Sequence, residues 1–133
     1  MYYFLTYGSL RRGESNFNAY CSYYNLEYIK TIEILGYKLY SFGPYPGINY
    51  TGDEKDVLVC DLLGTNQKEC SDSIDSMELG AGYHIEEKVI PYDEKEVTAK
   101  LYVYSNPLTD NLVPSGDWSK YLKEKYEKHK QVF

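Results

Sequence analysis

The N-terminal segment 1–13 reads MYYFLTYGSLRRG and combines an apolar run with a glycine-containing loop. Residues 2–7 are short, aromatic and apolar and end at Gly8, a pattern that predicts a buried first strand running straight into a loop. Glycine lets the backbone approach a ligand closely, and successive amides in such a turn can point into one concavity that holds an anion. We therefore interpret the loop 8–14 as a candidate carboxylate site. A tight turn with exposed arginines is the alternative.

Further strand patterns follow along the chain. Residues 26–42 are rich in Ile, Leu and Tyr and are interrupted only by Gly36, which indicates two strands or one bent strand. Residues 43–47 contain two prolines and two glycines, so we expect them to be irregular. The continuous apolar run within residues 56–64 is typical of a central strand.

The period then changes to that of a helix. Within residues 67–79, Cys70, Ile74 and Met77 are spaced four and three apart, which predicts that they share one side of a helix that stops at Gly80. The segments 83–92 and 96–104 come next and are separated by three polar residues. They predict a hairpin whose second strand turns alternate apolar residues towards the core.

A final helix is predicted from Trp118 to about residue 128, with Trp118, Leu122 and Tyr126 on its buried side. Strands joined by hairpins therefore dominate. We predict one α+β domain over residues 1–133, built as a curled, mostly antiparallel mixed sheet or small β-barrel with two or more short helices.

Composition narrows the class of protein. The chain has 133 residues, of which 43% are hydrophobic and 17% aromatic, including seventeen tyrosines, so a packed core is expected rather than disorder. Its formal charge of -6 would repel a polyanion, and Lys residues in the tail 120–130 alternate with Glu residues as on a solvated helical face. We therefore expect no nucleic-acid partner.

Three cysteines, Cys21, Cys60 and Cys70, lie far apart without a CxxC pair. This pattern supports neither a disulfide framework nor a zinc site, so we expect a reducing, cytoplasmic setting. The apolar start, residues 1–6, is short and lacks a cationic beginning, which argues against a signal peptide or a membrane span.

Glu78 is the candidate acid/base. It lies at the end of the predicted helix, where unpaired carbonyls disfavour an ionised carboxylate and should raise its pKa. Asp75, three residues earlier on the same side, would push the pKa in the same direction if both were buried. A raised pKa suits a group that takes and returns a proton near neutral pH. A solvated glutamate at a helix end is the commoner interpretation.

Tyrosines near these positions, especially Tyr45, Tyr83, Tyr102 and Tyr104, could line a pocket and present a hydroxyl to a polar substrate. Most of the seventeen tyrosines are better explained by the strand preference of this residue type. A nucleophilic cysteine activated by His84 is a third possibility, which no local sequence signature supports.

Five short motifs occur in order: Tyr-Gly-Ser-Leu at 7–10, Gly-Pro-Tyr-Pro-Gly at 43–47, Asp-x-x-Glu at 75–78, Gly-Tyr at 82–83 and Ser-Gly-Asp-Trp at 115–118. Each alone is unspecific. The ordered set, which spans nearly the whole chain, resembles the gamma-glutamylcyclotransferase-like family.

The resemblance implies a small barrel with a pocket at one end, in which the amides around Gly8, Ser9 and Leu10 hold the α-carboxylate of a γ-glutamyl group. Glu78 matches the family's catalytic glutamate. The implied reaction is intramolecular cyclisation of a γ-glutamyl amine or amino acid to 5-oxoproline, with release of the free amine and without a cofactor or metal.

The resemblance also implies that Tyr7, Tyr83 and Tyr102 contribute to substrate binding, with Tyr104 as the other tyrosine candidate. The expected partner is a small γ-glutamyl molecule, bound by a monomer or homodimer. Two positions depart from the family's pattern, Leu79 where a glycine is usual and Ile85 where an arginine is common. They motivate the alternative of a non-catalytic ligand-binding or regulatory module on the same fold.

Overall fold

The computed structural model describes the backbone of residues 1–132 and the side chains of residues 1–127. Phe133, the last residue of the expected domain, and the side chains at the end of the basic tail lie outside the described residues. The elements are, in chain order, β1 (Tyr2–Thr6), α1 (Ser15–Tyr24), β2 (Glu27–Leu35), β3 (Tyr37–Ser41), β4 (Pro46–Tyr50), β5 (Val57–Thr65), α2 (Lys68–Gly80), β6 (Tyr83–Tyr92), β7 (Lys95–Tyr104), β8 (Leu112–Val113) and α3 (Trp118–Val132).

The strands form two sheets. The larger has the order β2-β5-β1-β7-β6, and the smaller has the order β4-β3-β8. Only β1 and β7 pair in parallel, with Leu5 opposite Leu101, and all other described pairs are antiparallel. The predicted α+β class with mostly antiparallel strands is confirmed. The strands do not close into one barrel, because the chain leaves the larger sheet at Gly36 and builds the smaller one.

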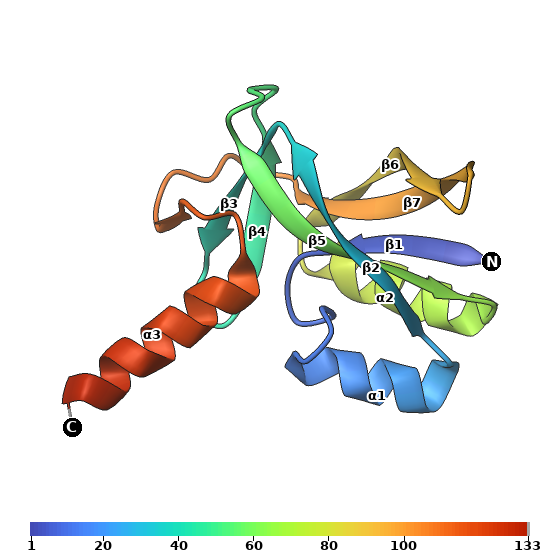
Figure 1. Ribbon diagram of the computed structural model, residues 1–133, viewed down its shortest axis with the longest axis horizontal. Coiled ribbons are helices and arrows are strands. Elements are labelled where there is room, and N and C mark those ends of the chain that lie inside the picture. Colours follow the sequence, from blue (N-terminus) through green and yellow to red (C-terminus); the bar gives the residue numbers. More distant parts are fainter. Residues whose placement is uncertain (133) are drawn as a thin grey trace.

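Strand β1 lies at the centre of the larger sheet with both faces covered (Figure 1). Phe4 belongs to a cluster with buried residues of α1 and α2, whereas Leu5 packs into the core that includes residues of both sheets. Both side chains are 0% exposed. A strand buried on both faces needs apolar residues at consecutive positions, which accounts for the unbroken apolar start of the chain.

The strand predictions hold with one exception. Gly36 separates β2 from β3, and the hairpin β6–β7 turns at Asp93 and Glu94, both with positive φ. Residues 43–47, expected to be irregular, include Pro46 and Gly47 at the start of β4. Proline is tolerated there because β4 is an edge strand, so the missing N–H costs no sheet hydrogen bond.

The helices depart more from expectation. Helix α1 was not predicted, because Ser, Asn and Tyr residues favour helix weakly and only Phe17 within it is buried. Met77 is 39% exposed rather than on the buried side of α2, and Tyr126 in α3 is 67% exposed. Figure 1 shows that α3 extends away from the sheets. Its first residue, Trp118, is buried in the core, and Leu122 still packs against that core as predicted, whereas Tyr126 lies beyond it.

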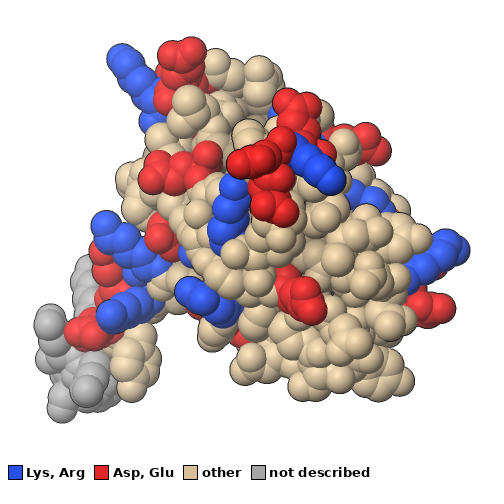
Figure 2. Space-filling view, turned by 45° about the vertical axis from the view of Figure 1, so that its right-hand side comes forward, with Lys and Arg blue, Asp and Glu red and all other residues tan. Residues whose placement is uncertain are grey.

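The surface is mixed in charge. Figure 2 shows Lys and Arg side chains interspersed with Asp and Glu side chains over one face of the molecule, with a broad uncharged area below them. Within the described residues, no helix combines the length and the apolar character needed to cross a membrane.

Candidate active site

A pocket of about 340 Å³ opens at the carboxyl end of β1. Its walls come from the loop after β1, the last turn of α2, the turn between β3 and β4, and the facing ends of β6 and β7. All seven residues predicted for the site line this pocket, namely Tyr7, Gly8, Ser9, Leu10, Glu78, Tyr83 and Tyr102. The structure thus brings together segments that lie more than ninety residues apart in sequence, from Tyr7 to Tyr102.

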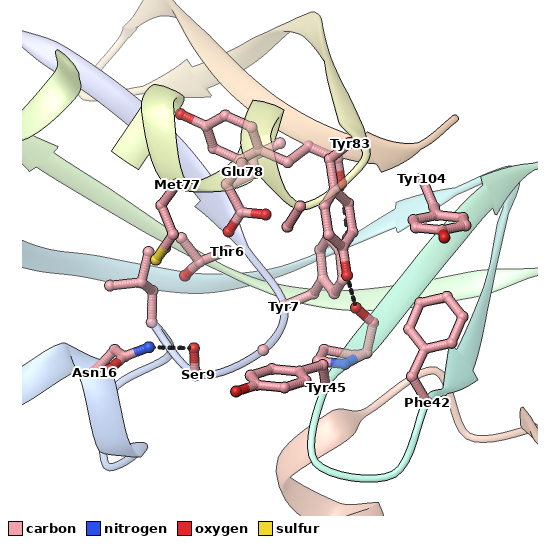
Figure 3. Close-up of a pocket in the computed structure, with 16 residues that line it drawn as sticks. Thr6, Tyr7, Ser9, Asn16, Phe42, Tyr45, Met77, Glu78, Tyr83 and Tyr104 are labelled. Atoms are coloured by element: carbon pink, nitrogen blue, oxygen red, sulfur yellow. Dashed lines mark hydrogen bonds between the residues drawn. The ribbon is translucent and has the colours of Figure 1, made fainter. Parts of the chain in front are cut away.

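Glu78 extends from α2 with its carboxylate directed into the pocket (Figure 3). It is the only charged side chain among the described residues of the lining. Burial raises the pKa of Glu78 from about 4.5 to about 7, because the ionised form loses hydration there. A carboxyl group with this pKa can accept and return a proton near neutral pH.

Asp75 does not act on Glu78 as the sequence suggested. Its carboxylate accepts hydrogen bonds from Lys100 Nζ and from the Tyr102 hydroxyl, both at 2.6 Å. The lysine charge offsets that of Asp75, so the raised pKa of Glu78 follows from burial and not from Asp75. The contacts of Asp75 fix α2 against β7 one turn before Glu78.

The loop at the end of β1 turns its carbonyls towards the protein. The carbonyl of Gly8 accepts from the Arg11 amide at 3.0 Å, and that of Ser9 accepts from the Asn16 amide at 2.9 Å. Asn16 Nδ2 also donates to Ser9 Oγ at 2.9 Å (Figure 3). Within the described residues, the amides of Gly8, Ser9 and Leu10 donate no hydrogen bond. Three adjacent free donors are suited to an anion.

Arg11 anchors this loop and is not one of the exposed arginines of the alternative interpretation. It is 8% exposed, and its Nη1 donates to Asp117 Oδ1 at 2.7 Å while its Nε lies 3.4 Å from Asp61 Oδ1. Asp61 also accepts from the Arg12 amide at 2.7 Å. These contacts join the loop to β5 and to the start of α3. The loop is therefore held in shape before any ligand arrives.

A matched pair of glycine variants tests the close packing of this loop. A Cβ atom added at Gly8 would lie 2.6 Å from Pro46 Cγ, inside a rigid ring, so we expect Gly8→Ala to lower the free energy of unfolding by about 1 to 3 kcal/mol. Gly80 has open space around its Cα, and Gly80→Ala in the last turn of α2 should stabilise slightly. Urea unfolding measures both. Equal stabilities of Gly8→Ala and the wild type would contradict the packing.

The predicted tyrosines line the pocket with their rings, and their hydroxyl groups bind protein acceptors and are not free to bind a substrate. Tyr7 donates its hydroxyl proton to the Tyr102 carbonyl at 2.7 Å, Tyr102 donates to Asp75, and Tyr83 donates to the Pro46 carbonyl. Burial raises the pKa of each of the three hydroxyl groups, so all three stay protonated. Tyr104, the other candidate, also lines the pocket.

Several lining residues were not predicted. Phe42 and Pro46 enter from the turn between β3 and β4, Asn16 comes from the unpredicted helix α1, and Met77 comes from α2. Their positions depend on how distant segments pack together. No local sequence pattern marks such residues.

A Cys/His centre is not formed. Cys60 and Cys70 are 0% exposed, and burial raises the pKa of the Cys70 thiol to about 11. His84 lies on the exposed side of β6, where its ring nitrogens contact Ser105 Oγ and Glu86 Oε2. Among the described residues, no three His, Cys, Asp or Glu side chains are grouped so that they could bind a metal ion.

Solved structures of other proteins share the fold of this chain. Among solved structures, an uncharacterised protein of Pyrococcus horikoshii has a TM-score of 0.75 and 22% identity, with 97% of this chain and 99% of that chain covered. An AIG2-like protein of Mus musculus has a TM-score of 0.69 and 13% identity, with 89% and 88% covered. A structure titled gamma-glutamyl cyclotransferase has a TM-score of 0.56 and 19% identity, with 79% and 67% covered.

These structural likenesses establish the fold. None of the curated proteins matches the chain in sequence. The sequence model of the family described as gamma-glutamyl cyclotransferase, AIG2-like, matches residues 4–120. Because that match covers most of its length, the chain belongs to the gamma-glutamyl cyclotransferase, AIG2-like family.

Proposed function

We propose that the protein is a cyclotransferase that converts a γ-glutamyl amine or γ-glutamyl amino acid into 5-oxoproline and the free amine. The observation that carries the proposal is the placement of Glu78, with a pKa of about 7, in a pocket that also contains the three free amides of Gly8, Ser9 and Leu10. The amides supply an anion site and the carboxylate supplies a proton carrier.

In the proposed reaction, the amides of the loop bind the α-carboxylate of the γ-glutamyl group. Glu78 removes a proton from the α-amine, whose nitrogen attacks the γ-carbonyl carbon and forms the new C–N bond of the five-membered ring. The C–N bond to the leaving amine then breaks, and Glu78 returns the proton to that amine. Because both reacting groups belong to one molecule, the protein has only to fold the substrate and place the proton carrier.

The scheme needs no metal ion or organic cofactor, since it involves only proton transfer and acyl transfer. We further propose that residues 1–133 form one domain that acts on small molecules as a monomer or homodimer in the cytoplasm. The tyrosines Tyr7, Tyr83 and Tyr102 would shape the substrate cavity with their rings.

The pH dependence of the reaction tests the role of the carboxylate. Only ionised Glu78 can accept the proton, so kcat/KM should rise about tenfold per unit at low pH and level off above a pH of about 7. A panel of γ-glutamyl dipeptides and γ-glutamyl-lysine is incubated with the protein at pH values from 5 to 9. The 5-oxoproline that is released is measured by chromatography. A flat profile would remove Glu78 as the base, and no product from any compound would overturn the proposed activity.

The alternative of a non-catalytic binding module rested on Leu79 and Ile85. Leu79 is 53% exposed, Ile85 packs beside the cluster around Phe4, and neither side chain lines the pocket. The two departures therefore leave the lining unchanged. A binding module would show a higher Tm with glutamate or 5-oxoproline and no consumption of any γ-glutamyl compound.

A further inference from the structure

The pocket offers a substrate carboxylate only uncharged hydrogen-bond donors. Among the described residues of its lining there is no Lys, Arg or His, and the one charge is that of Glu78. A carboxylate has two oxygens and about four positions that can accept a hydrogen bond. The free amides of Gly8, Ser9 and Leu10 can fill three of them. A further donor beside these amides would complete the set, because a hydrogen bond that a buried charge fails to make is costly.

The hydroxyl group of Ser9 is placed to be that donor. Figure 3 shows Ser9 below the Glu78 carboxylate, with both side chains directed into the pocket. Asn16 Nδ2 donates a hydrogen bond to Ser9 Oγ at 2.9 Å. An amide nitrogen can only donate, so Ser9 Oγ is the acceptor in this contact and its own proton is left over. Among the described residues, no group accepts that proton.

Asn16 is itself held firmly at the start of α1. Its backbone amide donates to the Ser9 carbonyl at 2.9 Å, so the backbone and the side chain of Asn16 both fasten Ser9 to this helix. The next residue, Phe17, packs into the apolar cluster shared by α1, α2 and β1, and the Tyr20 hydroxyl lies 3.1 Å from that of Ser73 in α2. The position of Asn16 is therefore set by the packing of α1 before any ligand arrives.

Resting on the proposed function, we infer that Asn16 is a positioning residue. By donating to Ser9 Oγ, it directs the Ser9 hydroxyl proton towards the ligand, so that the hydroxyl group joins the three amides in binding the α-carboxylate. Without Asn16 the hydroxyl group rotates freely, and its proton turns away from the carboxylate for part of the time. This role gives helix α1 a part in substrate binding.

Two ligands that differ only by the carboxylate test the inference. 5-Oxoproline carries the α-carboxylate on a lactam ring, and 2-pyrrolidinone is the same ring without it. We expect Asn16→Ala to raise the Kd of 5-oxoproline about tenfold, the usual effect of losing a hydrogen bond to a charged group, and to leave the Kd of 2-pyrrolidinone unchanged. NMR titration measures both. An unchanged Kd of 5-oxoproline, an equal rise for both ligands, or no binding of 5-oxoproline to the wild type would overturn the inference.

A double-mutant cycle decides whether Asn16 acts through Ser9. Ser9→Ala should also raise the Kd of 5-oxoproline about tenfold, and adding Asn16→Ala should then raise it by less than about twofold. Losses that multiply would mean that Asn16 contacts the ligand independently, and they would overturn the positioning role. Asn16→Asp should weaken binding more than Asn16→Ala does, because a carboxylate accepts the Ser9 proton and repels the ligand. Asn18→Ala, at an exposed position of the same helix, is the matched control and should leave both Kd values unchanged.

Turnover separates this inference from the proposed function. With a γ-glutamyl dipeptide as substrate, Asn16→Ala should raise KM about tenfold and change kcat by less than about twofold, because the α-carboxylate is bound alike in the ground state and the transition state. A fall in kcat with an unchanged KM would contradict the positioning role. If the wild type released no 5-oxoproline from any γ-glutamyl compound, the proposed function would fall, and the two titrations would still decide the role of Asn16.

Discussion

Glu78→Gln is expected to lower turnover by roughly a hundredfold or more while ligand binding survives. Glutamine keeps the size and shape of the side chain but cannot accept the proton of the substrate amine. The measurement is the initial rate of 5-oxoproline release, together with the rise in Tm caused by 5-oxoproline. Glu69→Gln, an exposed position in the first turn of α2, is the matched control and should keep wild-type turnover. Near wild-type turnover of Glu78→Gln would remove this residue from the mechanism.

The same substitution should stabilise the fold at high pH. The folded-state pKa of about 7 exceeds the ordinary value of 4.5, so the free energy of unfolding falls as pH rises between these values and stays lower above them. Glu78 is only partly buried, so we expect Glu78→Gln to gain about 1 to 2 kcal/mol at pH 8 and nothing near pH 4. Urea unfolding at the two pH values decides this. A gain of equal size at both would exclude ionisation as its cause.

Gly116→Ala is expected to lower the free energy of unfolding by about 3 kcal/mol or more, or to prevent folding. Gly116 has a φ of +67°, and an added Cβ atom would lie 1.8 Å from the carbonyl oxygen of Val57. The backbones at positions 116 and 57 cannot easily move apart, because the Val59 amide donates a hydrogen bond to the Gly116 carbonyl at 2.8 Å and holds the two segments together. The substitution therefore displaces β5, the strand beside β1, from the start of α3.

The control for backbone strain is Gly13→Ala. Gly13 has a φ of +89°, and nothing lies within 4 Å of the added Cβ atom. Gly13→Ala should therefore lower the free energy of unfolding by about 1 kcal/mol, which is the cost of placing alanine in the left-handed conformation. Guanidinium unfolding of both variants separates strain from collision. If the two variants lost equal stability, the close approach of Gly116 to β5 would be refuted.

The sequence predicted those parts of the fold that have a local signal. The alternation of apolar and polar residues in β7 and the continuous apolar run in β5 are local patterns that mark strands with buried faces. The order of the short motifs led to the correct family. The end of α2 at Gly80 was found because helix ends carry their own residue preferences. The loop after β1 was placed correctly because Gly8 follows the apolar run and glycine is typical of turns.

What the sequence could not provide depends on packing between distant segments. Helix α1 has weak intrinsic preference for helix, and its Tyr20 contacts Ser73 of α2. The pairing of Asp75 with Lys100 could not be foreseen, because these residues meet only when α2 lies on β7. The prediction for Asp75 failed for that reason, since a charge 25 residues away in sequence compensates it.

The parallel pairing of β1 with β7 has a consequence for how the protein assembles during synthesis. Tyr3 and Ala99 are neighbours across that pair, and Arg11, in the loop after β1, binds Asp117. Strand β1 and its loop can therefore complete their contacts only after nearly the whole chain has been synthesised. Contacts between residues so far apart in sequence are slow to form. A nascent chain that ends before β7 leaves one edge of β1 unpaired, and such an edge can join another chain. Glu78 would be translated well before the shape of the loop opposite it is completed.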